Sequence, residues 1–383
     1  MELCFNAMKA RILIIGIILA GFGITCKAQE PKSKLTLFRD SLDGAFDISN
    51  WLGSKKGFLV VPSIITEPAV GYGLAGAAVY FHSSYTEKSG PPSMTGVIGA
   101  GTQNGTWATG AFHIGYWNHD RIRYMGALAR TYANVGFYGS GFVPGLENQS
   151  INLNLDAWIV AQQVKFRVAE TDLFLGGRYI YMKTDNTFSM PVEMPEFDSL
   201  QFSANLSEAT AVVNYDSRDN IFTPTKGFFL ECSGTYSDTW MGGEDLYGRL
   251  AVTLIGYFPA TKKIVVGVRH ESSYSFGNVP YWARPIVVLR GAPKMKYQNN
   301  NTTVMEAEVD WNVYKRWYLL GFTGIGNAFE SLDSFDKGKS VSSVGTGFRY
   351  KIARKFGAQM GMDFAKSTDD FAFYFVFGCS WLR

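Results

Sequence analysis

The sequence predicts an all-β fold, a transmembrane antiparallel β-barrel of about sixteen strands, from three observations. Apolar residues alternate with small or charged residues along most of the chain, which is the period-two pattern of strands. Glycine (41 of 383 residues) and aromatic residues (15%) are abundant, while only 18% of residues are charged, a composition typical of membrane barrels. Beyond the N-terminal region no apolar run is long enough for a spanning helix, so only a closed barrel could cross a membrane.

The N-terminus predicts a cleaved secretory signal peptide over residues 1–28. Lys9 and Arg11 precede an apolar run at 12–24 that is too short to cross a bilayer, and a small residue, Ala28, ends the segment. The alternatives are a retained anchor helix and a lipoprotein attached at Cys26. The lipoprotein is disfavoured because the residues before that cysteine are not small.

The mature chain is expected to consist of a short leader and one barrel. Residues 29–56 are predicted to form a periplasmic or interfacial leader, either with a short amphipathic turn around Trp51 or frayed, and residues 57–383 form the outer-membrane barrel. Cleavage leaves Cys232 and Cys379, which we expect to be unpaired, apolar and lipid-facing.

The alternation predicts sixteen strands, near 58–66, 72–82, 94–103, 107–117, 121–133, 150–167, 172–184, 207–216, 227–237, 246–258, 263–275, 303–314, 317–328, 342–352, 356–366 and 371–382. An even number places both chain ends on the periplasmic side. Long connections then fall mostly on the outer side, as is usual for such barrels: 134–149, 185–206, 276–302 and 329–341. The long inner turn at 83–93 fits this asymmetry poorly.

One strand, at 305–313, shows why a barrel is favoured over a soluble sandwich. Its apolar residues share one face, and the other face carries Glu306, Glu308 and Asp310. Acids on an inner wall repel one another unless a cation lies near them, and the outer loop just before them contains Arg290-Gly291. Because arginine binds carboxylates bidentately, these residues are candidates for a loop lock; the alternative is a hydrated lumen wall.

Other chemistry is disfavoured. The formal net charge of +3 gives no reason to expect a nucleic-acid partner. The Gly-x-Gly-x-x-Gly match at 71–76 runs on into a strand, whereas nucleotide binding requires a helix there. The four histidines lack metal-ligand spacing, and no hydrolase motif occurs. We therefore expect no enzyme activity, no cofactor and no metal.

The segment 214–227 resembles the strand–turn–strand signature of the bacterial surface antigen barrels, the superfamily of the BamA and TamA outer-membrane assembly factors. Its polar side chains can bind turn backbone, its proline fixes φ and its final glycine permits the exit. The residues that carry the motif are Asp216, Arg218, Asp219, Asn220, Pro224 and Gly227. The resemblance covers roughly 57–383, and 345–349 and 361–365 are similar to the family's fourteenth and fifteenth strands.

The resemblance implies that Arg290 reaches into the barrel, where an acid on the thirteenth strand normally helps to hold it. Here 322–326 carries glycine at that position, and Asp310 stands where the twelfth strand of the family has arginine. We therefore expect Arg290 to pair with Asp310 or Glu308.

The resemblance further implies a barrel that aids assembly, insertion or translocation of outer-membrane proteins or lipids in a Gram-negative bacterium. The first and last strands would meet at a weak seam, which Pro62 and Gly378 could loosen. Expected partners are outer-membrane lipid and lipopolysaccharide, an unidentified client, and a periplasmic chaperone or POTRA-bearing partner, because 29–56 is too short for a POTRA domain. Alternatives are a loop-plugged transport or secretion pore and a structural surface barrel.

Overall fold

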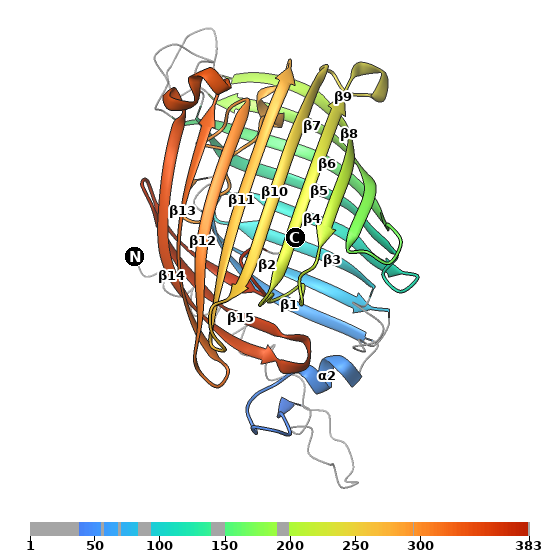
Figure 1. Ribbon diagram of the computed structural model, residues 1–383. Coiled ribbons are helices and arrows are strands. Elements are labelled where there is room, and N and C mark those ends of the chain that lie inside the picture. Colours follow the sequence, from blue (N-terminus) through green and yellow to red (C-terminus); the bar gives the residue numbers. More distant parts are fainter. Residues whose placement is uncertain are drawn as a thin grey trace, which may run out of the picture.

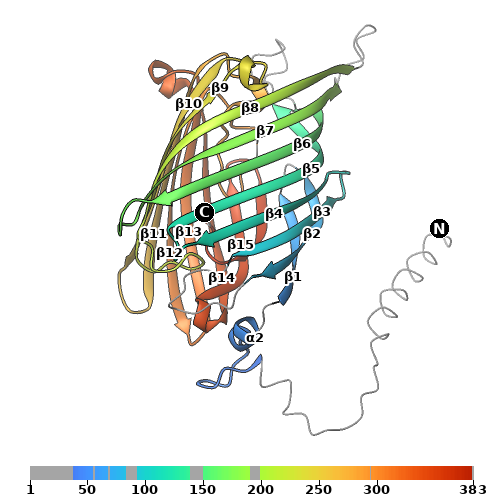
Figure 2. The ribbon, with the colours of Figure 1, turned by 90° about the vertical axis from the view of Figure 1, so that its right-hand side faces the viewer.

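A computed structural model describes residues 38–54, 57–67, 70–82, 93–138, 150–189, 199–293 and 295–381. Its strands form one sixteen-stranded antiparallel sheet in sequence order, which curls into a barrel (Figures 1 and 2). The predicted all-β class and strand number are therefore confirmed. The predicted signal peptide and most of the inner turn at 83–93 lie outside the described residues.

The strands are β1 (Gly57–Glu67), β2 (Gly71–Phe81), β3 (Met94–Thr102), β4 (Trp107–Trp117), β5 (Ile122–Tyr138), β6 (Ser150–Arg167), β7 (Leu173–Ser189), β8 (Ser199–Asp216), β9 (Gly227–Ser237), β10 (Tyr247–Pro259), β11 (Ile264–Gly277), β12 (Asn301–Tyr314), β13 (Trp317–Phe329), β14 (Lys339–Ala353), β15 (Ala358–Ser367) and β16 (Phe371–Phe377). A short helix, α2 (Ser49–Ser54), precedes β1. Short 3-10 helices are η2 (Thr239–Met241), η3 (Tyr281–Ala283), η4 (Leu332–Lys337) and η5 (Arg354–Phe356). None of the helices in the described ranges is long and apolar enough to cross a membrane.

The two faces of the wall differ as the alternation predicts. On β12, Met305, Val309 and Trp311 are exposed on the outer face, whereas Glu306 and Glu308 are buried on the inner face. An apolar outside and a charged inside suit a wall between lipid and a polar lumen.

The last strand is shorter than predicted, because β16 ends at Phe377 rather than near residue 382. Gly378 adopts a φ of +79°, which turns the chain inward, and the amide of Cys379 then donates to the carbonyl of Phe222 at 2.6 Å. The expectation that Cys379 faces lipid is therefore wrong, since its thiol lies beside the hydroxyl of Tyr257 at 3.6 Å. Cys232 and Cys379 are both free thiols.

The barrel has a seam between its first and last strands. Each strand pairs with its sequence neighbours, and among the described residues no backbone ladder joins β1 to β16, although the two strands lie near each other. Pro62 lies in the middle of β1, opposite Gly76 of β2, and its ring cannot donate to a ladder on the seam side. Gly378 follows β16 and donates its amide to Gln359 of the neighbouring strand.

Candidate functional site

The loop between β11 and β12, residues 278–300, folds back and packs against the inner wall. Val287, Leu289 and Tyr297 of the loop form a buried cluster with Val304 of β12 and Val341 of β14. Apolar burial of this kind holds the loop in place without directional contacts. The loop therefore plugs the lumen, and it places Arg290 next to the acids on the inner face of the barrel wall.

Arg290 is the centre of an ion-pair network. Its Nε lies 3.1 Å from Glu306 Oε1, and its Nη1 lies 2.6 Å from Glu308 Oε2 and 3.0 Å from Asp363 Oδ2. The guanidinium also stacks on the ring of Phe322, 3.4 Å from its centroid. Buried arginine with several carboxylates is a strong, directional anchor, and removing it would strand charges in a poorly solvated place.

Two further arginines balance the acids of this network. Arg349 of β14 binds Asp363 of β15 bidentately at 2.6 and 3.0 Å, and Arg269 of β11 approaches Glu306 at 2.7 Å. Three guanidinium groups thus meet three carboxylates. Arg269 also pairs with Glu271 at 3.3 Å, so the network extends along β11.

The C-terminal tail enters the same network. Ser380 Oγ lies 3.0 Å from Arg290 Nη1 and 3.0 Å from Asp363 Oδ2, and the indole of Trp381 donates to Glu306 Oε2 at 2.9 Å. Trp381 is buried. The tail of the seam strand and the plug loop are therefore joined through the same carboxylates.

The remaining predicted lock residues have different places. Gly291 has a φ of +84°, and a Cβ there would lie 3.2 Å from Ala365, so the loop needs glycine at this point. Its amide donates to the hydroxyl of Tyr374 at 2.9 Å, and its carbonyl accepts from Ser367 at 2.8 Å. Asp310 lies on the inner wall beside Glu308 but contacts no cation in the described residues.

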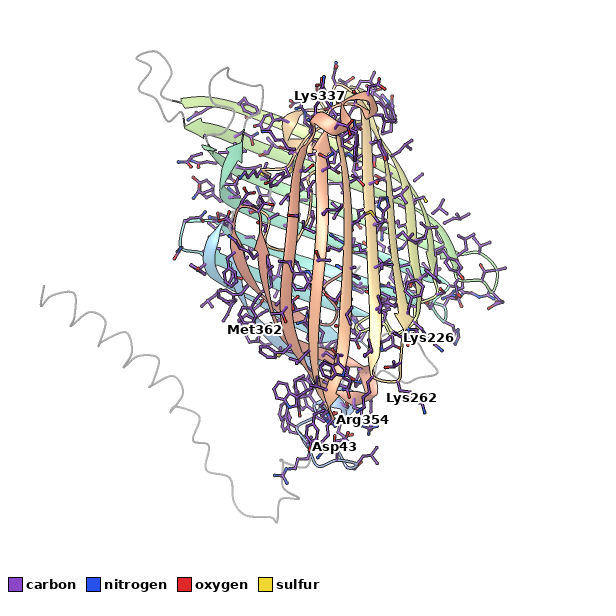
Figure 3. All side chains as sticks on the ribbon, turned by 60° about the vertical axis from the view of Figure 1, so that its left-hand side comes forward. Asp43, Lys226, Lys262, Lys337, Arg354 and Met362 are labelled. Carbon is purple, nitrogen blue, oxygen red and sulfur yellow. The ribbon has the colours of Figure 1, made fainter. Side chains whose placement is uncertain are left out.

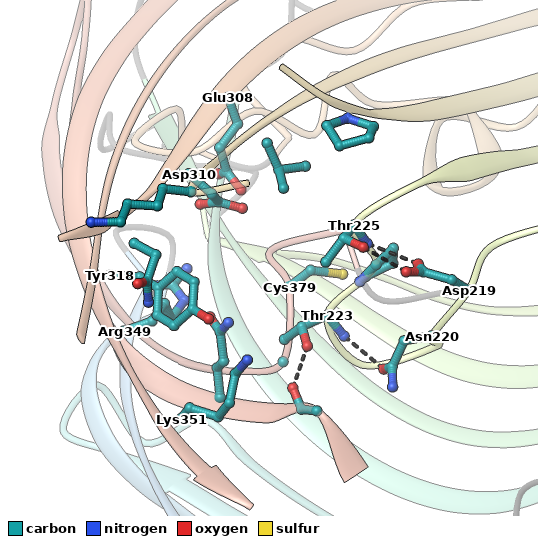
Figure 4. A pocket seen from close by; sticks show the side chains of 18 of the residues that line it. Asp219, Asn220, Thr223, Thr225, Glu308, Asp310, Tyr318, Arg349, Lys351 and Cys379 are labelled. Atoms are coloured by element: carbon teal, nitrogen blue, oxygen red, sulfur yellow. Dashed lines mark hydrogen bonds between the residues drawn. The ribbon is translucent and has the colours of Figure 1, made fainter. Parts of the chain in front are cut away.

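The turn motif joins the end of β8 to the start of β9. Asp216 accepts from Arg218 Nε at 2.8 Å and pairs with Arg123 at 3.0 Å. Asp219 accepts from the amide of Thr225 at 2.8 Å, as Figure 4 shows. The motif thus combines local hydrogen bonds within the turn with an ion pair from Asp216 to Arg123 of β5.

The rest of the motif connects the turn to the far wall. Asn220 caps the amides of Phe222 and Thr223 at 2.8 and 3.0 Å, and its Nδ2 donates to the carbonyl of Phe356 at 3.0 Å. Pro224 is buried, and Gly227 has a φ of +101°, where an added Cβ would clash with the carbonyl of Ser217. The turn therefore contacts the β14–β15 connection across the barrel mouth.

The leader forms a second ionic cluster beneath the barrel (Figure 3). Arg316, in the β12–β13 turn, pairs with Asp43 at 2.7 Å and Asp47 at 2.6 Å, and also contacts Asp40. Arg354 of η5 pairs with Asp40 as well. These contacts dock residues 38–54 on the last third of the barrel, although the leader precedes β1 in the chain.

Backbone contacts and side-chain electrostatics both hold the leader. The amide of Ile48 donates to the carbonyl of Ile352 at 2.8 Å, at the end of β14. Hydrogen bonds from Arg354 hold the pKa of Asp40 far below its usual value. Burial raises the pKa of Asp47, but hydrogen bonds from Ser49 and Arg316 outweigh burial, and the pKa of Asp47 is lowered. Both acids are therefore charged at neutral pH.

Several of these residues were not singled out as site residues from the sequence. The sequence marks Asp363 and Arg349 only as members of strands similar to those of the family, and it predicts Ser380 and Trp381 as part of the strand at 371–382. Arg316 and the leader acids carried no signal at all, because their pairing joins segments about 270 residues apart. Alternation places Asp363 on the inner face, but it cannot say which loop arginine reaches that strand.

The fold and the site define a class: sixteen-stranded barrels whose lumen is plugged by a loop that an arginine anchors. Residues 131–287 match the family model of the Omp85 superfamily domain. The match covers less than half of the chain, and the barrel topology agrees with it. The comparison with curated proteins gave no match.

Solved structures agree with this fold. The chain is similar to BamA from Haemophilus ducreyi lacking POTRA domains 1-3, with a TM-score of 0.57, 12% identity, and 85% of this chain and 70% of that chain covered. It is similar to CdiB from Escherichia coli (TM-score 0.56, 11% identity, 85% and 60% covered) and to CdiB from Acinetobacter baumannii (0.53, 8%, 84% and 59%). The chain thus spans about 60% of the two CdiB chains.

Proposed function

We propose that this barrel lies in the outer membrane of a Gram-negative bacterium and aids the insertion or translocation of outer-membrane proteins or lipids. One observation carries the proposal: in the part of the chain that the structure describes, β1 and β16 end the sheet without a ladder between them. An unpaired strand edge offers backbone donors and acceptors to an incoming strand. Pro62 on the seam strand supports the same reading, since it removes a donor.

The plug supports a controlled seam. Ser380 follows β16 and shares Asp363 with Arg290 of the loop. A movement of the loop therefore disturbs the end of the seam strand. A periplasmic partner would supply the client protein or lipid.

A loop-plugged secretion pore is the second candidate, favoured by the amount of apolar surface that the 278–300 loop buries in the lumen. The two candidates differ in what passes through. An insertase uses the seam, whereas a pore must conduct once the loop is displaced.

Assisted folding in liposomes tests the proposal. The purified barrel is reconstituted, and the folding of an unrelated denatured barrel protein is timed against empty vesicles. We expect acceleration, and a smaller acceleration with Arg290→Ala. Equal rates in barrel and empty vesicles would refute a self-sufficient insertase. Conductance across the same membranes, raised by Arg290→Ala, would instead favour the pore.

A further inference from the structure

The periplasmic mouth of the lumen contains a cavity of about 510 Å³ (Figure 4). Four lysines from three different elements line it: Lys262 and Lys263 of the β10–β11 turn, Lys315 of the β12–β13 turn and Lys351 of β14. The first three are exposed and Lys351 is half-buried. Figure 3 places Lys262 at the same end of the barrel as Arg354 and Asp43.

These lysines form no ion pairs that stabilise the described part of the barrel. Within the ranges that the structure describes, none of them pairs with a carboxylate, whereas the neighbouring arginines are all committed to acids. Lys351 lies over the ring of Tyr318 at 5.2 Å, and Lys315 lies over Tyr314 at the same distance. Such ring contacts orient an ammonium group without neutralising it.

The acids on the cavity leave the rim positive. Asp219 is occupied by the turn backbone, and Glu308 is occupied by Arg290 at 2.6 Å. Only Asp310 has no partner among the described residues, and it lies on β12 several residues further into the barrel than Lys315. The unpaired charge at the rim is therefore positive.

We propose that this lysine rim binds an acidic peptide segment of a client or of a periplasmic partner. Lysine is a flexible, hydrated point charge, so four of them can meet carboxylates spaced irregularly along an extended chain. A cluster of one sign also raises the rate at which an oppositely charged partner arrives. Because the four lysines lie at the mouth of the lumen, the rim is a docking surface for such a segment.

The position of the cavity favours a peptide over a lipid phosphate. The lysines surround the lumen mouth, whereas lipid contacts the outer face of the wall, where the exposed apolar residues of β12 lie. The inference rests on the proposed function for the orientation of the barrel, and it adds the chemistry of the segment received.

Fluorescence anisotropy with the full barrel in vesicles tests the inference. The probe is a short labelled peptide of alternating Glu and Ser, compared with the same peptide carrying Gln in place of Glu. The variant K262E/K263E reverses two rim charges, and K337E/K339E makes the same change at the outer end as a matched control. Heat-modifiable electrophoretic mobility verifies that each variant is folded.

We expect the Glu peptide to bind and the Gln peptide not to bind. K262E/K263E should weaken binding roughly tenfold at low salt and flatten its salt dependence, and K337E/K339E should leave both unchanged. Equal binding of the two peptides, or equal losses in the two variants, would overturn the inference. Displacement of the peptide by phosphatidylglycerol vesicles, but not by phosphatidylcholine vesicles, would assign the rim to lipid phosphate and also overturn it.

Failure of this inference is distinguishable from failure of the proposed function. Peptide binding without any acceleration of barrel folding would leave the rim as a docking surface and refute the insertase. Acceleration without peptide binding would refute the rim alone.

Discussion

Replacement of Arg290 is the sharpest perturbation of the plug. Arg290→Ala leaves Glu306 with Arg269 and Asp363 with Arg349, but Glu308 keeps only a 3.5 Å contact with Ser380. One carboxylate is therefore stranded in a buried place. Breaking a buried ion pair in this way costs about 3–5 kcal/mol.

This energy falls on the loop, because Arg290 is the loop residue that pairs with the inner-wall acids Glu306, Glu308 and Asp363. A cost of about 3–5 kcal/mol raises the population of the displaced loop by roughly a hundredfold to a few thousandfold. We expect faster hydrogen exchange and faster proteolysis across 278–300 in the reconstituted barrel. Arg290→Lys should give an intermediate result, since an ammonium group cannot reach several carboxylates as a fork.

Two companion variants make the reasoning refutable. Glu308→Gln in the Arg290→Ala background removes the stranded charge and should restore part of the protection. Asp310→Asn should change nothing, because Asp310 contacts no cation in the described residues. The reasoning is wrong if Arg290→Ala leaves loop exchange within threefold of the native rate, or if Asp310→Asn disturbs it equally.

Three other changes have definite expected outcomes. Arg316→Ala strands the leader acids, so residues 38–54 should become protease-sensitive while heat-modifiable mobility persists; unchanged cleavage of the leader would contradict this. Gly378→Ala forces a left-handed alanine whose Cβ would lie 2.8 Å from the carbonyl of Phe222, so it should destabilise the barrel by about 1–2 kcal/mol in urea unfolding, and a native midpoint would argue against the strained turn. The pKa values of Asp40 and Asp47 are lowered from 3.8, so their contribution to docking is complete above about pH 4 and is lost as pH falls further. Cleavage of the leader should therefore stay constant from pH 7 to about pH 5, measured with a protease active across that range, and release within it would contradict the assignment.

Most of the barrel wall was predictable because apolar and small or polar residues alternate along the whole length of a barrel strand. Three strands, 107–117, 150–167 and 227–237, were predicted with the bounds that the structure has. The start of β8 was missed by eight residues, since 199–206 extends beyond the clear alternation.

The end of β16 shows that alternation alone does not predict where a strand stops. Alternation continues from Phe371 through Trp381, yet the strand stops because Cys379 binds the carbonyl of Phe222, more than 150 residues away. The contacts of Arg290 were also only partly predictable. Alternation places the acids that face Arg290 on the inner wall. It does not show that Asp363 of β15 lies within reach, because the distance between strands around the barrel depends on their tilt. The contacts of residues 38–54 depend on the positions of the β12–β13 turn and the β14–β15 connection. No periodic pattern in the sequence predicts these positions.

The docked leader also sets a length limit on the seam. Ile48 is fixed to the end of β14, and β1 begins at Gly57, while the closed wall places β15 and β16 between them. Three strand spacings need about 14 Å. With α2 helical, the chain from Ile48 to Gly57 reaches about 22 Å at most. Under the proposed function, this end of the barrel can therefore admit one extra strand with the leader in place. A client hairpin of two strands would require α2 to unwind or Ile48 to leave its partner.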